Sequence, residues 1–215
     1  EKRFLPDRYV EGKCYICGYE SARGDQCDNC GNLMDAIKLI NPRSRNNPDD
    51  ELVVRQAEHY FLALDKFADQ ILQYLDAYQD SWRPNVTKFS QNFVKDGLRG
   101  RPITRDIDWG IAVPLEGWDE KRLYVWFEAV MGYFTASIEW AKNIGKPDEW
   151  KKWWYNPDAK IYNFIGKDNI PFHTIIWQAE LFGVDGIYNE DDDEYGDAKL
   201  QLPYDVPANE FMNIE

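Results

Sequence analysis

Two Cys-x-x-Cys pairs constrain this chain more than any other feature of its sequence. Cys14 and Cys17 form the first pair, Cys27 and Cys30 form the second, and the sequence has no other cysteine. Two thiolate pairs supply the tetrahedron of soft ligands that Zn²⁺ prefers. Because sulfur would fill all four positions and leave none open for water, we expect one structural zinc ion without a catalytic role.

Two alternatives use the same cysteines. Two disulfides are disfavoured because the chain shows no secretory signal and because twin Cys-x-x-Cys spacing is typical of zinc sites. A thioredoxin-like redox pair is disfavoured because neither pair lies between a clear strand and helix. Gly18 and Gly31 follow the second cysteine of each pair, where a positive φ is expected. Residues 14–40 have so little apolar content that we expect this module to need its metal to fold.

Length and charge limit the possibilities further. With 215 residues and 44% hydrophobic content, the chain can form one large or two small domains with a buried core. No stretch approaches the roughly 20 apolar residues of a membrane span, so we expect no membrane association. No signal peptide is present either, so we expect a cytoplasmic protein. The formal net charge of −13 argues against strong nucleic-acid binding by this segment alone.

In the first half, residues 41–50 have loop composition and residues 58–64 resemble a strand. Asp65 is expected to cap a helix, and a second helix is expected to begin at Asn85 or Thr87 and end near Gly97. The spacing of the apolar residues predicts a buried face on each helix. These residues are Phe67, Ile71, Leu75 and Tyr78 on the first helix, and Phe89, Phe93 and Val94 on the second.

The second half predicts two strand–helix units. Residues 122–127 and 160–165 are expected strands, followed by helices over 128–143 and 170–182, with Pro171 in the first turn and Gly183 at the end of the last helix. Residues 148–156 read as a short aromatic helix, 190–194 as a solvated loop and 203–215 as irregular. Strand–helix units in series predict an α/β fold with a parallel sheet.

Ligands of such sheets bind beyond the carboxyl ends of the strands, which here are the turns 126–133 and 166–177. Ala129 and Tyr133 are four residues apart and share a helical face, and the same spacing relates Asn169, His173 and Trp177. The two faces are expected to meet over a crevice lined by aromatic rings and one imidazole. Ordinary core roles for His173, Trp177 and Trp126 remain open on spacing alone. The sequence contains neither a P-loop nor a G-x-G-x-x-G fingerprint.

Several motifs in order resemble one family. Phe4–Gly12 precedes the cysteine pairs, and Thr104–Gly110, Tyr124–Ala129 and Phe164–Asp168 follow them. Together they cover nearly the whole chain, which therefore resembles the methionyl-tRNA synthetases, a class I aminoacyl-tRNA synthetase family. The resemblance implies a Rossmann-like catalytic fold interrupted by a connective-peptide insertion. Residues 1–103 would be that insertion, with the zinc knuckle at 14–31 and the return helices, and residues 104–215 the second half of the catalytic domain.

The resemblance also implies roles for individual residues. Trp126, Ala129, Tyr133, His173 and Trp177 would line a methionine pocket, with Asn169 beside it. Gly166 and Asp168 would lie near the ribose of ATP or the adenylate, and Arg105 near the amino-acid end of the site. The implied reaction is the ATP-dependent activation of methionine to methionyl-adenylate, with Mg²⁺ accompanying ATP, and transfer to tRNA(Met).

The chain departs from the family pattern in informative places. The phosphate-binding signatures, His-Ile-Gly-His and a Lys-Met-Ser-Lys-Ser-like loop, are missing, so catalytic residues are unassigned and we expect an inactive fragment of a longer enzyme. Val130 stands in the pocket region where many members have proline. Some relatives carry a second zinc knuckle, but residues 43–47 lack the cysteines for one, so we expect one zinc ion. Two other interpretations remain, which are a non-catalytic paralogue serving as a zinc-containing interaction module and a leucyl- or isoleucyl-type synthetase.

Overall fold

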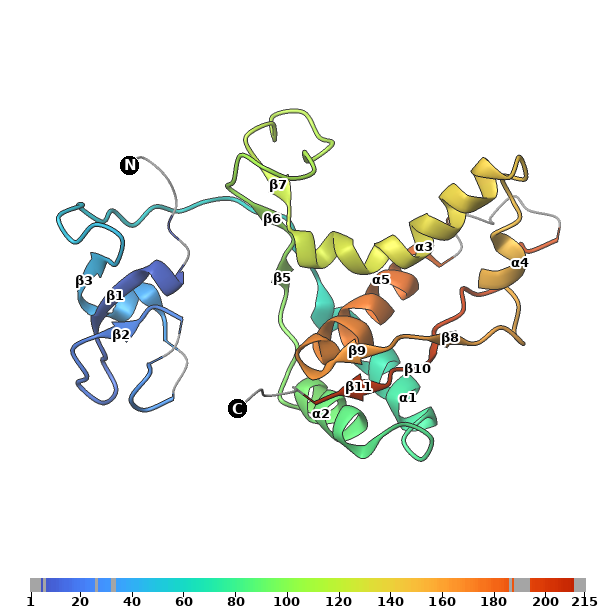
Figure 1. Ribbon diagram of the computed structural model, residues 1–215, viewed down its shortest axis with the longest axis horizontal. Helices are drawn as coiled ribbons and strands as arrows, with labels where there is room; N and C mark the ends of the chain where they lie inside the picture. The colour runs from blue at the N-terminus through green and yellow to red at the C-terminus, as the bar shows by residue number, and fades with distance from the viewer. Residues whose placement is uncertain are drawn as a thin grey trace. The chain divides into compact units, whose positions relative to one another are not determined.

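The computed structural model describes residues 5, 7–25, 27–31, 34–185, 187 and 194–210 (Figure 1). The chain divides into two compact units, Glu1–Glu58 and His59–Glu215. Residues 59–103 therefore group with the second unit. The boundary expected near residue 103, between the connective-peptide insertion and the catalytic domain, is a different division of the chain, and it stays a prediction.

The first unit is a small antiparallel sheet. Its strands are β1 (Val10–Lys13), β2 (Ala22–Arg23) and β3 (Ile40–Ser44), in the order β2-β1-β3, accompanied by the 3-10 turns η1 (Asp7–Tyr9) and η2 (Ala36–Lys38). The loop expected over 41–50 is wrong for residues 41–44, because these residues pair with β1 and Arg43 forms an ion pair with Glu11. Cys14, Ala22, Cys27 and Leu39 are the buried centre of this unit.

The second unit combines helices with short two-stranded ladders. The first part contains β4 (Phe61–Leu62), η3 (Leu64–Phe67), α1 (Ala68–Ala77), α2 (Pro84–Lys95), β5 (Arg101–Pro102), β6 (Thr104–Arg105) and β7 (Arg122–Leu123). The remainder contains α3 (Val125–Asn143), α4 (Lys151–Trp154), β8 (Ile161–Tyr162), β9 (Ile165–Gly166), η4 (Lys167–Asn169), the π-helical turn η5 (Phe172–Ile176), α5 (Trp177–Val184), β10 (Pro203–Asp205) and β11 (Ala208–Asn209). Strands β10 and β11 pair in parallel with β8 and β9, whereas β4–β5 and β6–β7 are antiparallel.

Both helices expected in the first half are present, but their caps differ from the prediction. The turn preceding α1 already begins at Leu64, so Asp65 lies inside it and is not a cap. Helix α2 begins with Pro84 in its first turn, where the missing N–H costs nothing, and neither Asn85 nor Thr87 caps it. The expected end of α2 near Gly97 is confirmed, and Gly97 has a φ of 100°.

Three predictions for the second half are wrong in part. The strand expected over 122–127 stops at Leu123, and α3 already begins at Val125. The last helix contains a π-helical turn and runs through Gly183 to Val184. Residues 203–209 are not irregular, because β10 and β11 pair in parallel with β8 and β9, and Val206 and Ala208 are buried. Of the predicted loop 190–194, residues 190–193 lie outside the described part of the chain.

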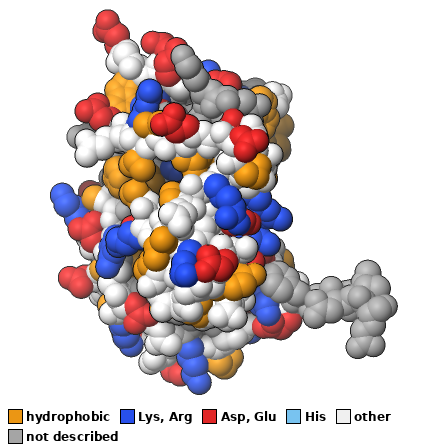
Figure 2. Space-filling model, turned by 90° about the vertical axis from the view of Figure 1, so that its left-hand side faces the viewer, with side chains coloured by type: hydrophobic (Ala, Val, Ile, Leu, Met, Phe, Trp, Pro, Cys, Tyr) orange, Lys and Arg blue, Asp and Glu red, His pale blue; other side chains and the backbone are white. Residues whose placement is uncertain are grey.

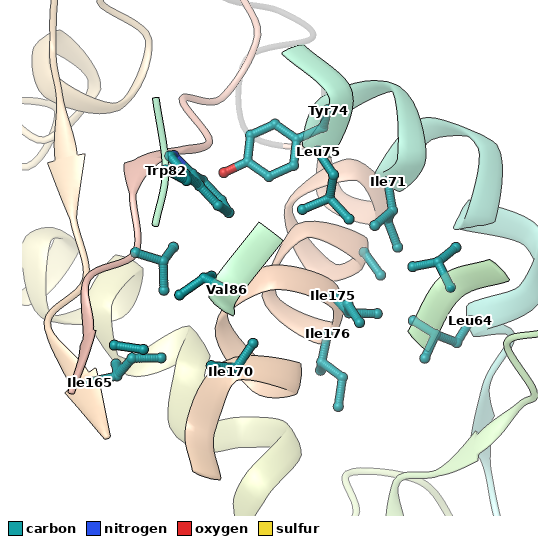
Figure 3. Close-up of a cluster of buried hydrophobic side chains, with 14 residues drawn as sticks. Leu64, Ile71, Tyr74, Leu75, Trp82, Val86, Ile165, Ile170, Ile175 and Ile176 are labelled. Atoms are coloured by element: carbon teal, nitrogen blue, oxygen red, sulfur yellow. The ribbon is translucent and has the colours of Figure 1, made fainter. Parts of the chain in front are cut away.

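Two hydrophobic clusters hold the second unit together. One joins α1 and α2 to η5 through residues such as Ile71, Leu75, Val86 and Ile175, and Figure 3 shows these side chains converging. The expected core face of α1 is thereby confirmed. The other joins α3 to α4 and α5 through Phe134, Trp150, Trp154, Trp177 and Leu181. Helix α3 lies beside η5 and α5, and this contact positions the residues of the candidate site.

Charges of both signs occur together on the surface. Figure 2 shows basic and acidic side chains interspersed among hydrophobic ones on the face that it presents, so the net charge of −13 does not form a single acidic surface there. Within the described residues, no helix is both long enough and apolar enough to span a membrane.

Candidate functional site

The four cysteines come together in the first unit. The Sγ atoms of Cys14 and Cys30 are 4.0 Å apart, those of Cys17 and Cys27 are 3.7 Å apart, and all four lie within 4.8 Å of one another. A tetrahedron with metal–sulfur bonds of about 2.3 Å has sulfur–sulfur edges of about 3.8 Å, close to these values. Disulfide bonds need about 2.05 Å, so the arrangement contradicts the disulfide alternative and fits a metal ion.

The backbone around the first pair is built to hold thiolates. The N–H groups of Ile16 and Cys17 each lie 3.4 Å from Sγ of Cys14, and the bond from Cys17 does most to lower the pKa of that thiol. Gly18 and Gly31 have φ values of 78° and 71°, which confirms the positive φ predicted for both. These turns return the chain after each cysteine pair, and they bring the two pairs to one point.

A cavity of about 320 Å³ lies in the second unit between α3, the β9 segment and the helix that follows it. Five residues predicted for the methionine pocket line it, together with Gly166 of β9, which was predicted near the ribose. The five are Trp126, Ala129, Tyr133, Asn169 and His173. The predicted meeting of the two turns over one crevice is thereby confirmed.

One imidazole and one phenol are joined at the wall of this cavity. The hydroxyl of Tyr133 lies 2.9 Å from Nε2 of His173, and Nδ1 of the same ring lies 3.0 Å from the backbone carbonyl of Asn169. A carbonyl only accepts, so Nδ1 carries the proton. Burial lowers the pKa of His173 against the opposing bond to Asn169, so the ring is neutral at pH 7 and Nε2 accepts the proton of Tyr133.

The π-helical turn beneath His173 is stabilised by a side chain. A π turn interrupts the regular α-helical hydrogen bonds and commonly occurs at functional sites. The side-chain amide of Gln178 donates to the backbone carbonyl of His173 at 2.8 Å, and Gln178 is fully buried. The hydroxyl of Thr174 donates to the carbonyl of Ile170 and also meets Ser90 of α2 at 2.8 Å. The wall that carries His173 is thus tied to the core.

Three predicted residues lie outside the cavity lining. Trp177 is 1% exposed and packs behind Tyr133, with ring centroids 6.3 Å apart. Tyr133 also contacts His173, with ring centroids 5.7 Å apart, so both residues meet the same ring, and the role predicted for Trp177 in the pocket stays a prediction. Arg105 instead lies over the ring of Tyr124. Asp168 adjoins Gly166, where an added Cβ would meet its carboxylate at 2.7 Å.

The sequence interpretation did not assign four further lining residues to the pocket. These are Val130, Phe164, Ile165 and Phe172. Phe172 stacks at a tilt on Trp126 with centroids 5.4 Å apart, and Phe164 is 75% exposed. Phe164 and Ile165 belong to the predicted strand 160–165 and to the motif Phe164–Asp168, and their position directly before Gly166 is the signal that could have included them.

Comparison with known proteins is consistent across the whole chain. The family profile described as tRNA synthetases class I (M) matches residues 1–215. The chain is 54% identical over its full length to a methionine–tRNA ligase of Thermomicrobium roseum and covers 34% of that protein. It is 50% identical to the methionine–tRNA ligase of Picrophilus torridus, covering 99% of this chain and 29% of that protein. The chain thus spans about a third of the length of these relatives.

Solved structures give the same fold. The methionyl-tRNA synthetase of Mycobacterium tuberculosis in complex with methionyl-adenylate matches 97% of this chain and 32% of its own, with a TM-score of 0.58 and 24% identity. The free form of that protein matches with a TM-score of 0.56 at the same identity. At this level of identity the match concerns the fold alone.

Proposed function

Because the chain belongs to the methionyl-tRNA synthetase family of class I, we propose that it supplies the methionine pocket of a methionine–tRNA ligase. The observation that carries the proposal is the cavity walled by Trp126, Tyr133 and His173. The whole protein would activate methionine with ATP to methionyl-adenylate and transfer it to tRNA(Met). Residues outside this chain would bind the phosphates, so the 215 residues alone are expected to be inactive.

The cavity has the chemistry that a thioether needs. Aromatic rings are favourable partners for a polarizable sulfur, and Trp126 and Phe172 line the cavity with ring centroids 5.4 Å apart. The proton of Tyr133 is already donated to His173, so its oxygen faces a ligand as an acceptor. For Tyr133 to donate a hydrogen bond to the sulfur, its hydroxyl would have to turn its proton away from Nε2 of His173. Rejecting an analogue by apolar contacts alone yields about 1–3 kcal/mol, so homocysteine is a difficult competitor.

One buried group supports a rearrangement of the aromatic residues when methionine binds. The indole Nε1 of Trp177 is buried and has no hydrogen-bond partner among the described residues. A buried donor without a partner costs free energy, which a movement toward an acceptor would recover. We therefore keep Trp177 in the proposed pocket as a second layer that packs on Tyr133 and responds to the ligand.

The remaining assignments concern ATP and the fold. Gly166 and Asp168 adjoin at the carboxyl end of β9, the position at which nucleotides bind in parallel sheets. The parallel pairs β8–β10 and β9–β11 support a Rossmann-like half-domain. We assign ATP with Mg²⁺, methionine and tRNA(Met) as ligands of the whole enzyme, and we place the enzyme in the cytoplasm.

The metal of the cysteine cluster is proposed to be zinc. Four thiolates in a tetrahedral arrangement favour Zn²⁺, and no ligand position is left for water. Zinc would stabilise the fold of residues 7–58, whose buried centre consists of few residues, and it would take no part in the reaction.

Amino-acid-dependent ATP–pyrophosphate exchange by the full-length enzyme tests the proposal, with methionine, leucine and isoleucine compared. Exchange with methionine alone supports it. Exchange with leucine or isoleucine would retain the fold and overturn the pocket assignment. The absence of exchange with all three would favour a non-catalytic paralogue that uses the cysteine module for interaction. Robust exchange by residues 1–215 alone would contradict the expected inactivity of the fragment.

A further inference from the structure

His59 lies outside the cavity and joins two residues of one short segment. Its Nδ1 atom is 3.0 Å from the hydroxyl of Thr104, and its Nε2 atom is 3.1 Å from a carboxylate oxygen of Asp106. Thr104 is fully buried, and the side chains of His59 and Asp106 are 20% and 21% exposed. One imidazole thus holds residues 104 and 106 at the same time.

The hydrogen-bond partners determine the state of this ring. The carboxylate of Asp106 only accepts, so Nε2 carries the proton. Thr104 accepts the backbone N–H of Tyr60 at 3.1 Å and donates its own proton to Nδ1. The ammonium of Lys121 lies 2.6 Å from the other oxygen of Asp106. Burial, together with the charge of Lys121, lowers the pKa of His59 against the opposing charge of Asp106. With a neutral ring, both nitrogens of His59 still have their hydrogen-bond partners, Thr104 and Asp106.

A nucleophilic role for this cluster is excluded by burial. Hydroxyl, imidazole and carboxylate occur in the order of a catalytic triad, but Thr104 is 0% exposed and its oxygen already has two hydrogen-bond partners. No substrate reaches that atom. The cluster therefore acts on the position of the segment that it holds.

Arg105 lies between the two held residues. Successive side chains of a strand point to opposite faces, so Arg105 projects away from His59. Its guanidinium carbon lies 3.9 Å from the centroid of the Tyr124 ring, and it donates to the backbone carbonyls of Pro102 and Thr104 at 3.0 and 2.8 Å. Tyr124 immediately precedes α3, and two residues further along Trp126 lines the cavity. The cation is thus fixed at the end of α3 that leads into the pocket.

We propose that His59 is a positioning residue for Arg105. By holding Thr104 and Asp106 on one face of the segment, His59 fixes the guanidinium on the other face, where it receives the carboxylate of the amino-acid substrate. This inference rests on the proposed function, because it needs an anionic substrate group at Arg105.

A double-mutant cycle in the full-length enzyme tests the link. His59→Ala is expected to reduce kcat/KM for methionine about tenfold in the wild-type background, mainly through KM for methionine, and to have almost no further effect in an Arg105→Ala background. His59→Asn and His59→Gln each keep one of the two contacts and should restore part of the loss. Equal effects of His59→Ala in both backgrounds would overturn the proposal.

A matched control separates positioning from simple destabilisation. Leu75→Ala removes a fully buried side chain from α1, in a cluster that contains neither His59 nor Arg105. It should lower stability without changing KM for methionine, and its effect should add to that of Arg105→Ala. If Leu75→Ala reproduces the change in KM, the role of His59 is merely structural and the proposal fails.

A crystal structure of the His59→Ala enzyme decides the question without any substrate. Departure of the Arg105 guanidinium from Tyr124 supports positioning, and an unchanged guanidinium refutes it. If the wild-type enzyme shows no exchange with methionine, the proposed function fails, whereas this structural outcome still decides whether His59 fixes Arg105.

Discussion

The phenol of Tyr133 and the imidazole of His173 are joined by a hydrogen bond of 2.9 Å between α3 and the π-helical turn. Forty residues separate them in the sequence, and both line the same cavity. The Asn169 carbonyl occupies the other ring nitrogen, so the direction of the bond is fixed from Tyr133 to His173. The protons of the Tyr133 hydroxyl and of Nδ1 of His173 are therefore already used in hydrogen bonds within the free protein.

Tyr133→Phe is predicted to weaken methionine binding. The change leaves Nε2 of a buried ring without its donor, which costs about 1–3 kcal/mol of folding stability. KM for methionine should rise as well, because the imidazole in the cavity wall is no longer held by the phenol. Pyrophosphate exchange by the full-length enzyme measures this effect. Tyr162→Phe is the matched control, because Tyr162 is 48% exposed and lies outside the cavity. Equal effects of the two substitutions would contradict the role of Tyr133.

Acidification is predicted to destabilise the fold through His173. Burial holds its pKa below the ordinary value of 6.5, so at mildly acidic pH the unfolded chain binds a proton that the folded chain does not. The free energy of unfolding should therefore fall as the pH drops below about 6.5 and continue to fall through the folded pKa. Urea denaturation at several pH values measures it. His173→Asn should reduce this dependence and leave the share of His59, whose pKa burial also lowers, and an unchanged slope would refute the assignment.

Glu180→Gln is predicted to stabilise the protein at neutral and alkaline pH. Both carboxyl oxygens of Glu180 are buried without a hydrogen-bond partner in the described part of the chain, and burial raises its pKa to about 9. Unfolding between the ordinary pKa and this value releases a proton, so the wild type loses stability as pH rises. We expect a gain of about 1–3 kcal/mol for the variant at pH 8, shrinking toward pH 5. Glu139→Gln, at an exposed position, serves as the control and should leave the stability at pH 8 unchanged.

Removal of the metal is predicted to unfold the first unit selectively. Cys14→Ser or Cys27→Ser removes a buried ligand from a cluster that contains few other buried residues. The purified chain should contain one zinc ion per molecule, and each variant should lose the metal and become sensitive to proteases within residues 7–58. Two ions per chain, or a variant as protease-resistant as the wild type, would contradict the assignment of a single structural site.

Gln178→Leu is predicted to destabilise the cavity wall. The substitution leaves the carbonyl of His173 without the amide that now bonds it at 2.8 Å, which costs about 1–3 kcal/mol. Thermal unfolding measures the loss, and KM for methionine should rise because His173 shifts. Gln91→Leu removes an exposed bond to Asp76 and serves as the control. The prediction fails if the control is equally destabilised.

Local chemistry made the metal cluster predictable. Four cysteines in two short pairs determine a ligand set whatever surrounds them, and Gly18 and Gly31 mark the turns that return the chain. The two helical faces were also predictable, because a spacing of four residues places Ala129 and Tyr133 together in any α-helix.

Longer-range relationships could not be predicted from periodicity. Residues 203–209 contain prolines and resemble a loop, yet they form β10 and β11 because partners some forty residues earlier complete their hydrogen bonds. The position of Val125 as the start of α3 depends on Tyr124, whose N–H bonds the Ile103 carbonyl of a distant segment. The cluster around His59 was missed for the same reason, since its members are spread over residues 59–121.

The π turn amounts to one extra residue within an otherwise regular helix. Its hydrogen bonds span five residues instead of four, and His173 lies within the turn whereas Trp177 directly follows it. A deletion of one residue within 172–176 would restore the α-helical register and rotate everything after it. The half of this helix that carries His173 and the half that begins at Trp177 would therefore change register relative to each other in a relative that lacks the extra residue. A correct sequence alignment of one half does not guarantee a correct alignment of the other.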